Sequence, residues 1–287
     1  MKLITFRHDD EIRHGYLIED GTVIQPLGDG DLGSLVHRLD DATLTASGPA
    51  LPLADVEVLS PLLRPGKLLA AAANYQDHVT EAGGDPLDKS RLSPRLFLKP
   101  PTSIVGPGAG IPMPSVTRQV DWEAELGVVI GATARDVSVS RALDIVGGYL
   151  TSNDVSARSM DFGFERDTDD KAVWFFDWLA GKWLDGFAPM GPWLVTPDEV
   201  PDPQDLEIIL DVNGKRRQHG STKDMIFSVA ELVSFASTLM TLEPGDVILT
   251  GTPSGVGAAT GEYLSEGDEM SVTIGGLGTL TNRMVAR

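Results

Sequence analysis

Hydrophobic and polar residues alternate along much of the chain, in runs too short for long helices. The first 25 residues alternate on both sides of Glu19-Asp20-Gly21, and an Asp-Gly pair between such runs predicts a β-hairpin. Further short apolar runs predict buried strands over residues 67–73, 95–99, 120–130, 146–152, 206–212 and 244–250. The pattern therefore favours a protein built mainly from strands.

One stretch, residues 225–240, has the spacing of an amphipathic helix. Its apolar side chains recur every three or four positions, at Ile226, Val229, Leu232, Val233 and Ala236. Shorter helices are predicted over residues 32–39, 74–84 and 140–145. Residues 159–178, which are charged and then aromatic, are expected to form a mobile insertion. A few helices among many strands place the chain in the α+β class.

Residues 61–66 interrupt the pattern with two prolines and a glycine, which is typical of a linker. We therefore expect a small β-rich N-terminal domain over residues 1–65 and a larger domain over residues 66–287. The chain of 287 residues is 41% hydrophobic and 23% charged, the proportions of a globular protein. A chain of this length can bury a full core without disulfides.

Composition excludes several classes of function. The net charge of −19, without a basic stripe, argues against a nucleic-acid partner. Cysteine is absent, which excludes disulfides, thiolate metal ligands and a cysteine nucleophile. There is no apolar run of about 18 residues to predict a membrane span. The N-terminus becomes charged before any stretch of signal-peptide length, so we expect a cytoplasmic protein with no membrane partner.

Three acidic residues are candidates for a metal site. Glu123 and Glu125 lie two apart in the predicted strand over 120–130, so their side chains would share a face and repel without a cation. Asp154 follows the strand over 146–152 and could add a third carboxylate. Such a set suits Mg²⁺ or Mn²⁺. Taken singly, each acid is more simply explained as an exposed strand residue or a turn former.

His78 and Glu81 are candidates for acid–base chemistry. In a helix they would share a face, and a carboxylate beside an imidazole fixes its tautomer and raises its basicity. A general base that activates water needs this arrangement, although an exposed helix pair is the simpler alternative.

Two further motifs could bind an anion. Lys182 follows an aromatic run, so it is either a solvated lysine or a partly buried cation that binds a substrate carboxylate or enolate. The glycine-rich residues 250–257 offer backbone N–H groups, but they match neither a Walker motif nor a Rossmann fingerprint, since no clear helix follows.

The order of these motifs along the chain is more specific than any one of them. It runs Asn74-Tyr75-x-x-His78-x-x-Glu81, Phe97-Leu-Lys99-Pro-Pro-Thr-Ser, Asp121-Trp-Glu123-Ala-Glu125-Leu, Asn153-Asp154-Val-Ser-Ala-Arg158, Gly181-Lys182, Pro189-Met-Gly191-Pro192 and Thr250-Gly-Thr252-Pro-Ser-Gly255-Val-Gly257. Over residues 66–287 this order resembles the fumarylacetoacetate hydrolase family. The resemblance implies a mixed β-sandwich roll and a homodimer.

The resemblance also implies roles for individual residues. Glu123, Glu125 and Asp154 would hold Mg²⁺ or Mn²⁺. His78 and Glu81 would activate water, on a segment that a ligand orders as a lid. The implied substrate contacts are Lys182, Tyr75, Lys99, Arg158 and, for the substrate carboxylate, Thr252.

We therefore expect a metal-dependent hydrolase that cleaves a carbon–carbon bond of a small β-diketo acid such as an acylpyruvate. The alternatives are a decarboxylase of oxaloacetate type and an isomerase or hydratase of a diacid from aromatic catabolism. A member that only binds metal would have little use for the His78–Glu81 pair.

The chain departs from the family's pattern at three places. Ala72 stands where glycine is frequent, Ser159-Met160-Asp161 replaces Asp-x-Gln, and Trp183 follows Lys182 in place of serine. With the nearby aromatic run, these departures predict a narrower or more apolar pocket.

Overall fold

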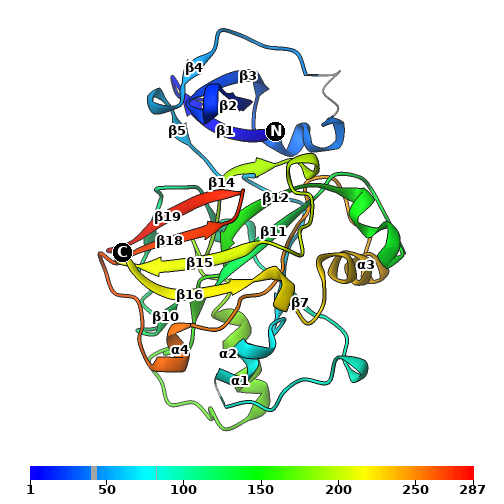
Figure 1. Ribbon diagram of the computed structural model, residues 1–287. Coiled ribbons are helices and arrows are strands. Elements are labelled where there is room, and N and C mark those ends of the chain that lie inside the picture. Colours follow the sequence, from blue (N-terminus) through cyan, green and yellow to red (C-terminus); the bar gives the residue numbers. More distant parts are fainter. Residues whose placement is uncertain (40–43, 82) are drawn as a thin grey trace.

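The structure is a computed structural model that describes residues 1–39, 44–81 and 83–287. Strands dominate the described part of the chain (Figure 1). They are β1 (Lys2–His8), β2 (Glu11–Ile18), β3 (Val23–Asp29), β4 (Leu51–Pro52), β5 (Glu57–Val58), β6 (Leu68–Ala72), β7 (Arg95–Leu98), β8 (Ile104–Val105), β9 (Gly110–Pro112), β10 (Val120–Asp121), β11 (Ala124–Ile130), β12 (Val146–Asn153), β13 (Ser156–Ala157), β14 (Ala188–Val195), β15 (Glu207–Val212), β16 (Lys215–Ser221), β17 (Val247–Leu249), β18 (Glu269–Ile274) and β19 (Gly278–Val285). The α-helices are α1 (Gln76–Glu81), α2 (Lys171–Ala180), α3 (Val229–Leu239) and α4 (Gly257–Thr260). Among these described helices, none is both long and apolar enough to cross a membrane.

Most strands belong to one large mixed sheet of 12 strands, in the order β4-β3-β2-β1-β14-β12-β11-β17-β6-β7, with β5 and β8 attached at its side. Strands β6 and β17 pair in parallel, while β11 and β12 are antiparallel. Strand β1 pairs with β14, so the N-terminal strands continue the sheet of the larger unit. The α+β class is confirmed, and the domain boundary at residue 65 stays a prediction.

A second sheet covers part of the first. It has five strands in the order β16-β15-β18-β19-β9, and it lies across β11, β12 and β14 (Figure 1). Apolar side chains fill the space between the sheets, among them Leu126 and Val128 of β11 and Ile208 and Leu210 of β15. Strand β11 is buried along its whole length, so any carboxylate that it carries is removed from bulk water.

Helix α3 confirms the predicted amphipathic helix but begins later than the apolar pattern does. Ser228 caps it, because its side chain accepts the N–H of Glu231 while the Glu231 carboxylate accepts the N–H of Ser228. The preceding residues instead pair with Asn74, whose side-chain oxygen accepts the N–H of Phe227 and whose backbone oxygen accepts that of Ile226. This pairing anchors the start of the segment that carries α1.

The remaining helix predictions differ in detail from the structure. Residues 139–145 and parts of 32–38 form 3-10 turns rather than α-helix. The predicted insertion over 159–178 contains a helix that was not expected there, since α2 begins after the N-cap Asp170. Arg166 pairs with Asp177 at 2.5 Å and ties the preceding loop to this helix. Helices α1, α2 and α4 gather at one end of the sheets (Figure 1).

Candidate active site

Three carboxylates meet at the adjoining ends of β11 and β12. These strands pair with Ala124 opposite Asn153, so Glu123, which precedes β11, and Asp154, which follows β12, lie beside each other. Glu125 lies within β11. One oxygen from each of Glu123, Glu125 and Asp154 lies within 4.8 Å of the others, and all three residues are buried. The strand pairing therefore assembles the predicted triad.

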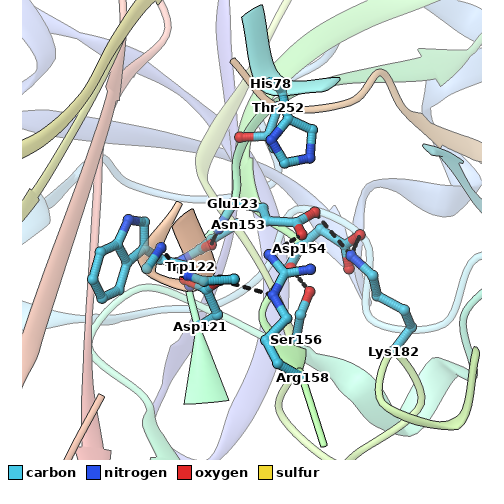
Figure 2. Close-up of polar contacts among 12 residues, drawn as sticks. His78, Asp121, Trp122, Glu123, Asn153, Asp154, Ser156, Arg158, Lys182 and Thr252 are labelled. Atoms are coloured by element: carbon cyan, nitrogen blue, oxygen red, sulfur yellow. Dashed lines mark hydrogen bonds and ion pairs between the residues drawn. The ribbon is translucent and has the colours of Figure 1, made fainter. Parts of the chain in front are cut away.

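Basic side chains surround two of the three acids. Lys182 Nζ lies 2.8 Å from Glu123 Oε2 and 2.7 Å from Asp154 Oδ2, while Lys99 Nζ contacts the other oxygen of Asp154 at 2.5 Å. Arg158 contacts Glu123 Oε1 at 2.6 Å (Figure 2). The predicted residues Lys99, Arg158 and Lys182 thus all lie at the triad.

These charges change the pKa values of the buried groups in opposite directions. Burial by itself would raise the pKa of Glu123, but the charges of Lys182 and Arg158 outweigh it and hold that pKa well below its usual value. Burial raises the pKa of Glu125 far above its usual value, and the charges of Asp154 and Glu123 raise it further. Burial also lowers the pKa of Lys99. Glu123 and Asp154 therefore have basic side chains that balance their negative charge, whereas Glu125 has none in contact with it among the residues that the structure describes.

Glu125 provides the test of whether a metal ion fits the triad. Within the described residues it has no basic partner, and its Oε2 accepts the N–H of Gly251 at 2.7 Å. A buried carboxylate that faces two others is costly to keep ionised, and a hard divalent cation with oxygen ligands removes that cost. The donor set and its burial fit such an ion.

The His78–Glu81 pair is present and is anchored to the glycine-rich loop. His78 Nδ1 lies 2.7 Å from Glu81 Oε1, and Glu81 Oε2 accepts the N–H of Gly255 at 2.7 Å. Asp77 on the same helix accepts hydrogen bonds from Ser254. With Nδ1 directed at the carboxylate, Nε2 is left to face a ligand. That a ligand orders this segment stays a prediction.

The glycine-rich loop uses several of its N–H groups on carboxylates of the chain itself. Besides the bonds from Gly251 to Glu125 and from Gly255 to Glu81, Asp121 accepts the N–H groups of Gly257 and Ala258 at the start of α4. A short helix therefore does follow the loop, which corrects the expectation that none does. Asp121 also holds Arg158 Nε at 2.7 Å. The loop was predicted to bind an anion, and part of its N–H groups bind carboxylates of the chain itself.

A cavity of about 480 Å³ lies beside the carboxylate triad and the His78–Glu81 pair. Its wall includes His78, Glu123, Arg158, Lys182 and Thr252, together with Phe97 of β7 and Trp174, Phe175 and Trp178 of α2. Figure 2 shows His78 and Thr252 together on one side of Glu123, with Lys182 approaching from another. The predicted aromatic contribution to the pocket is therefore present in the fold.

Tyr75 does not line this cavity. Its side chain is fully buried in the core, and its hydroxyl has no hydrogen-bond partner among the described residues. The role of Tyr75 in substrate binding stays a prediction.

Two residues at the site were not predicted from the sequence. Arg95 of β7 lines both this cavity and an adjacent one of about 770 Å³, and it forms no ion pair with any described residue. Gln218 of β16 is buried and hydrogen-bonds Thr252. In the sequence, neither differs from an ordinary surface residue of a strand, so no local signal could have identified them.

Comparisons with known proteins agree with this arrangement. The family model described as "Fumarylacetoacetate (FAA) hydrolase C-terminal" matches residues 67–285, and a model described as "Rv2993c-like, N-terminal" matches residues 1–61. Among solved structures, fumarylacetoacetate hydrolase from the psychrophile Exiguobacterium antarcticum is 37% identical with a TM-score of 0.84, covering 100% of both chains.

Two other similar structures have different activities in their names. One is 5-carboxymethyl-2-hydroxymuconate delta-isomerase from Mycobacterium smegmatis, which is 34% identical with a TM-score of 0.80 and coverage of 100% of both chains. The other is maleylpyruvate hydrolase from Sphingobium, which is 28% identical with a TM-score of 0.78 and the same coverage. Proteins of this fold thus include both hydrolases and isomerases.

Proposed function

Since the chain belongs to the fumarylacetoacetate hydrolase family, we propose that it is a divalent-metal-dependent hydrolase that cleaves a carbon–carbon bond of a small β-diketo acid. The observation that supports this most is the composition of one cavity wall. It carries a His–Glu pair suited to activating water, and it includes Glu123 of a carboxylate triad suited to a metal ion. A homodimer in the cytoplasm is part of the same proposal.

The triad of Glu123, Glu125 and Asp154 is proposed to hold Mg²⁺ or Mn²⁺, since both ions prefer carboxylate and water oxygens. When bound, such an ion supplies Lewis-acid polarisation of the carbonyl oxygens of a 2-keto acid. The buried amino groups of Lys182 and Lys99 compensate part of the triad's negative charge. The anionic substrate thereby meets a site that is less negative than three free carboxylates would be.

His78 is proposed as the general base. Glu81 accepts a hydrogen bond from Nδ1–H and stabilises the imidazolium, so that Nε2 can take a proton from water. The hydroxide oxygen adds to the distal carbonyl carbon of the diketo acid. The bond from that carbon to the central methylene carbon then breaks, and its electron pair forms the enolate of the departing 2-keto acid. Protonation of the enolate carbon by His78 completes the balance, giving a carboxylic acid and a 2-keto acid.

Lys182 and Thr252 are proposed to bind the anionic parts of the substrate. Lys182 Nζ lies on the cavity wall and carries a full charge, because the attraction of Asp154 and Glu123 outweighs burial and raises its pKa. It can therefore stabilise negative charge that develops on an enolate oxygen. Thr252 offers a neutral hydroxyl at the same wall.

An isomerase of an unsaturated diacid is the second candidate. It is favoured by the similarity over the full chain to the isomerase from Mycobacterium smegmatis and to 2-hydroxyhepta-2,4-diene-1,7-dioate isomerase from Mycobacterium marinum, 35% identical. Isomerisation would use His78 to move a proton between carbon atoms, without adding water.

A turnover screen distinguishes these candidates. Acylpyruvates, oxaloacetate and unsaturated hydroxy-diacids are each incubated with Mg²⁺ or Mn²⁺ and followed by the loss or shift of the enol absorbance. We expect hydrolysis of an acylpyruvate that His78→Ala abolishes, with metal affinity almost unchanged. Hydrolysis that persists in His78→Ala overturns the assignment of the base. Faster conversion of a diacid without loss of carbon favours the isomerase, and faster carbon dioxide release favours the decarboxylase.

A further inference from the structure

A buried glutamine connects the residue between Glu123 and Glu125 to the loop that carries Thr252. Gln218 lies in β16 of the smaller sheet and is 1% exposed. Its side-chain oxygen accepts the N–H of Ala124, the residue between Glu123 and Glu125, at 2.9 Å. Its side-chain nitrogen donates to Thr252 Oγ1 at 2.8 Å and to the Pro253 carbonyl at 2.8 Å.

The partners of Gln218 fix the orientation of its amide. A backbone N–H can only donate and a backbone carbonyl can only accept, so the oxygen must face Ala124 and the nitrogen must face Pro253. The second N–H of the same nitrogen is then directed at Thr252. Thr252 Oγ1 consequently accepts from Gln218, whatever the rotation of its own hydroxyl hydrogen.

This arrangement determines what Thr252 can do. A hydroxyl has one hydrogen to donate, and no described residue accepts one from Thr252. Thr252 lies on the cavity wall together with His78 and Glu123 (Figure 2). With an acceptor site already occupied by Gln218, the hydroxyl hydrogen is available to a ligand in the cavity, and hydrogen bonds to charged acceptors are the stronger ones.

We propose that Gln218 is a positioning residue for substrate binding: it holds the Thr252 hydroxyl as a hydrogen-bond donor toward the carboxylate of a bound keto acid. The inference rests on the proposed function. It goes beyond it by assigning a task to a residue of the second sheet, which does not itself line the cavity. The simpler alternative is that Gln218 only holds the sheet and the loop together.

A double-mutant cycle on ligand binding separates these two roles. The probe is oxalate, an unreactive dianion with adjacent carboxylate groups, and its affinity for the Mg²⁺-loaded protein is measured by calorimetry. In the protein with Thr252, we expect Gln218→Met to lower oxalate affinity about tenfold, because the hydroxyl loses its fixed orientation toward a charged group. In the Thr252→Val background the same substitution should change affinity less than about threefold, because no hydroxyl remains to be positioned.

Matched variants and a second readout control for folding. Thr252→Ser keeps the hydroxyl, so Gln218→Met should again lower oxalate affinity in that background. Mg²⁺ affinity without oxalate, and the thermal unfolding temperature, report damage to the triad or to the fold. Should Gln218→Met fail to fold, Gln218→Glu serves in its place. In its ionised form, reached at a pH above the pKa of the new carboxyl, it keeps the acceptor for Ala124 but cannot donate to Thr252. Comparing its effect in the wild-type and Thr252→Val backgrounds removes the effect of its added charge.

Each outcome decides between the roles. A loss that depends on the hydroxyl at residue 252 supports positioning. An equal loss in both backgrounds, or no loss in either, overturns it while leaving the proposed function intact. If the wild-type protein binds Mg²⁺ but no oxalate, the proposed keto-acid site fails, and the inference about Gln218 fails with it.

Discussion

His78 Nδ1 lies 2.7 Å from Glu81 Oε1. The second oxygen of Glu81 is held by the N–H of Gly255, so the carboxylate cannot turn away from the imidazole without breaking a bond to the glycine-rich loop. The loop at residues 250–257 therefore sets the direction of the proposed base, although it is distant from it in sequence. Helix α1 is only six residues long, so this anchoring compensates for the weak intrinsic stability of a short helix.

We predict that Glu81→Gln lowers the turnover number about 10- to 100-fold, because an amide stabilises an imidazolium less well than a carboxylate does. Mg²⁺ affinity should stay within about twofold of wild type, since Glu81 is not in the triad. Steady-state kinetics and calorimetry measure the two quantities. His219 and Glu207 form the matched control, a His–Glu pair at 2.8 Å with both side chains 59% exposed. Glu207→Gln should leave both quantities unchanged, and wild-type turnover by Glu81→Gln would refute the dyad.

The two glutamates of the triad should respond in opposite ways to neutralisation. We predict that Glu125→Gln raises the metal-free unfolding free energy at pH 7 by about 1 kcal/mol or more. On folding at pH 7, the wild-type carboxyl must either keep a buried charge that faces two others or take up a proton, and the amide needs neither. The folded-state pKa of Glu125 is above its unfolded value, so this acid favours folding only at low pH and loses that contribution as pH rises. The gain should therefore shrink as pH falls through the unfolded-state pKa of about 4.3 and disappear below it, where the carboxyl is protonated in both states. Chemical denaturation of both proteins at several pH values, with a chelator present, measures this difference in unfolding free energy.

Glu123→Gln is the matched control for that experiment. Arg158 and Lys182 contact Glu123, so neutralising this carboxylate leaves buried cations without their partner. The substitution should lower the unfolding free energy by about 3 kcal/mol. Its folded-state pKa is below the unfolded value, so its contribution is present above the unfolded pKa and is lost as pH falls further. Both variants should abolish the rise in unfolding temperature that Mg²⁺ gives wild type. Stabilisation of either variant by Mg²⁺ would contradict the triad as the metal site.

Hydrophobic periodicity was sufficient to predict about half of the strands and the main helix, but not β14 of the central sheet. The apolar run over 120–130 corresponds to β10 and β11, and the spacing over 225–240 corresponds to α3. The start of α3 could not be predicted from that spacing. Asn74, which is distant in sequence, accepts hydrogen bonds from the N–H groups of Ile226 and Phe227, and Ser228 then caps the helix.

The sequence predicted which residues form the candidate site, but not the contacts between them. Glu123, Glu125 and Asp154 meet because β11 pairs with β12, a long-range register that spacing alone does not define. The use of loop N–H groups by Glu81 and Glu125 likewise depends on tertiary packing. Gln218 reaches the site from the second sheet, so only the packing of the two sheets reveals it.

Arg95 is placed to distinguish diacids from substrates with a neutral tail. It is exposed at the cavity, where the other basic groups already have carboxylate partners. We predict that Arg95→Gln raises the KM of a substrate with a distal carboxylate about three- to tenfold, and that high salt reduces this difference. The KM of an acylpyruvate with an uncharged tail should not change. Arg91→Gln, on an exposed turn outside the cavity, is the control. Equal effects on both substrates would exclude this role.

Helix α2 should determine how tightly the protein binds substrates with apolar tails. Trp174 lines both cavities and is 63% exposed, so it contributes to a ligand's surroundings more than to the core. We predict that Trp174→Ala raises the KM of an acylpyruvate with a phenyl tail about tenfold, because the tail loses an aromatic wall against which to bury its surface. The KM of acetylpyruvate and the unfolding temperature should hardly change.

Phe176 provides the comparison within the same helix. It is 61% exposed, but it lies outside the cavity lining. Phe176→Ala therefore removes a similar aromatic group from α2 and should leave the KM of both substrates at wild-type values. If Phe176→Ala raises the KM of the phenyl substrate as much as Trp174→Ala does, the effect comes from the helix as a whole. If neither substitution changes it, α2 is not a wall for the substrate tail, and the apolar tail must be bound elsewhere in the cavity.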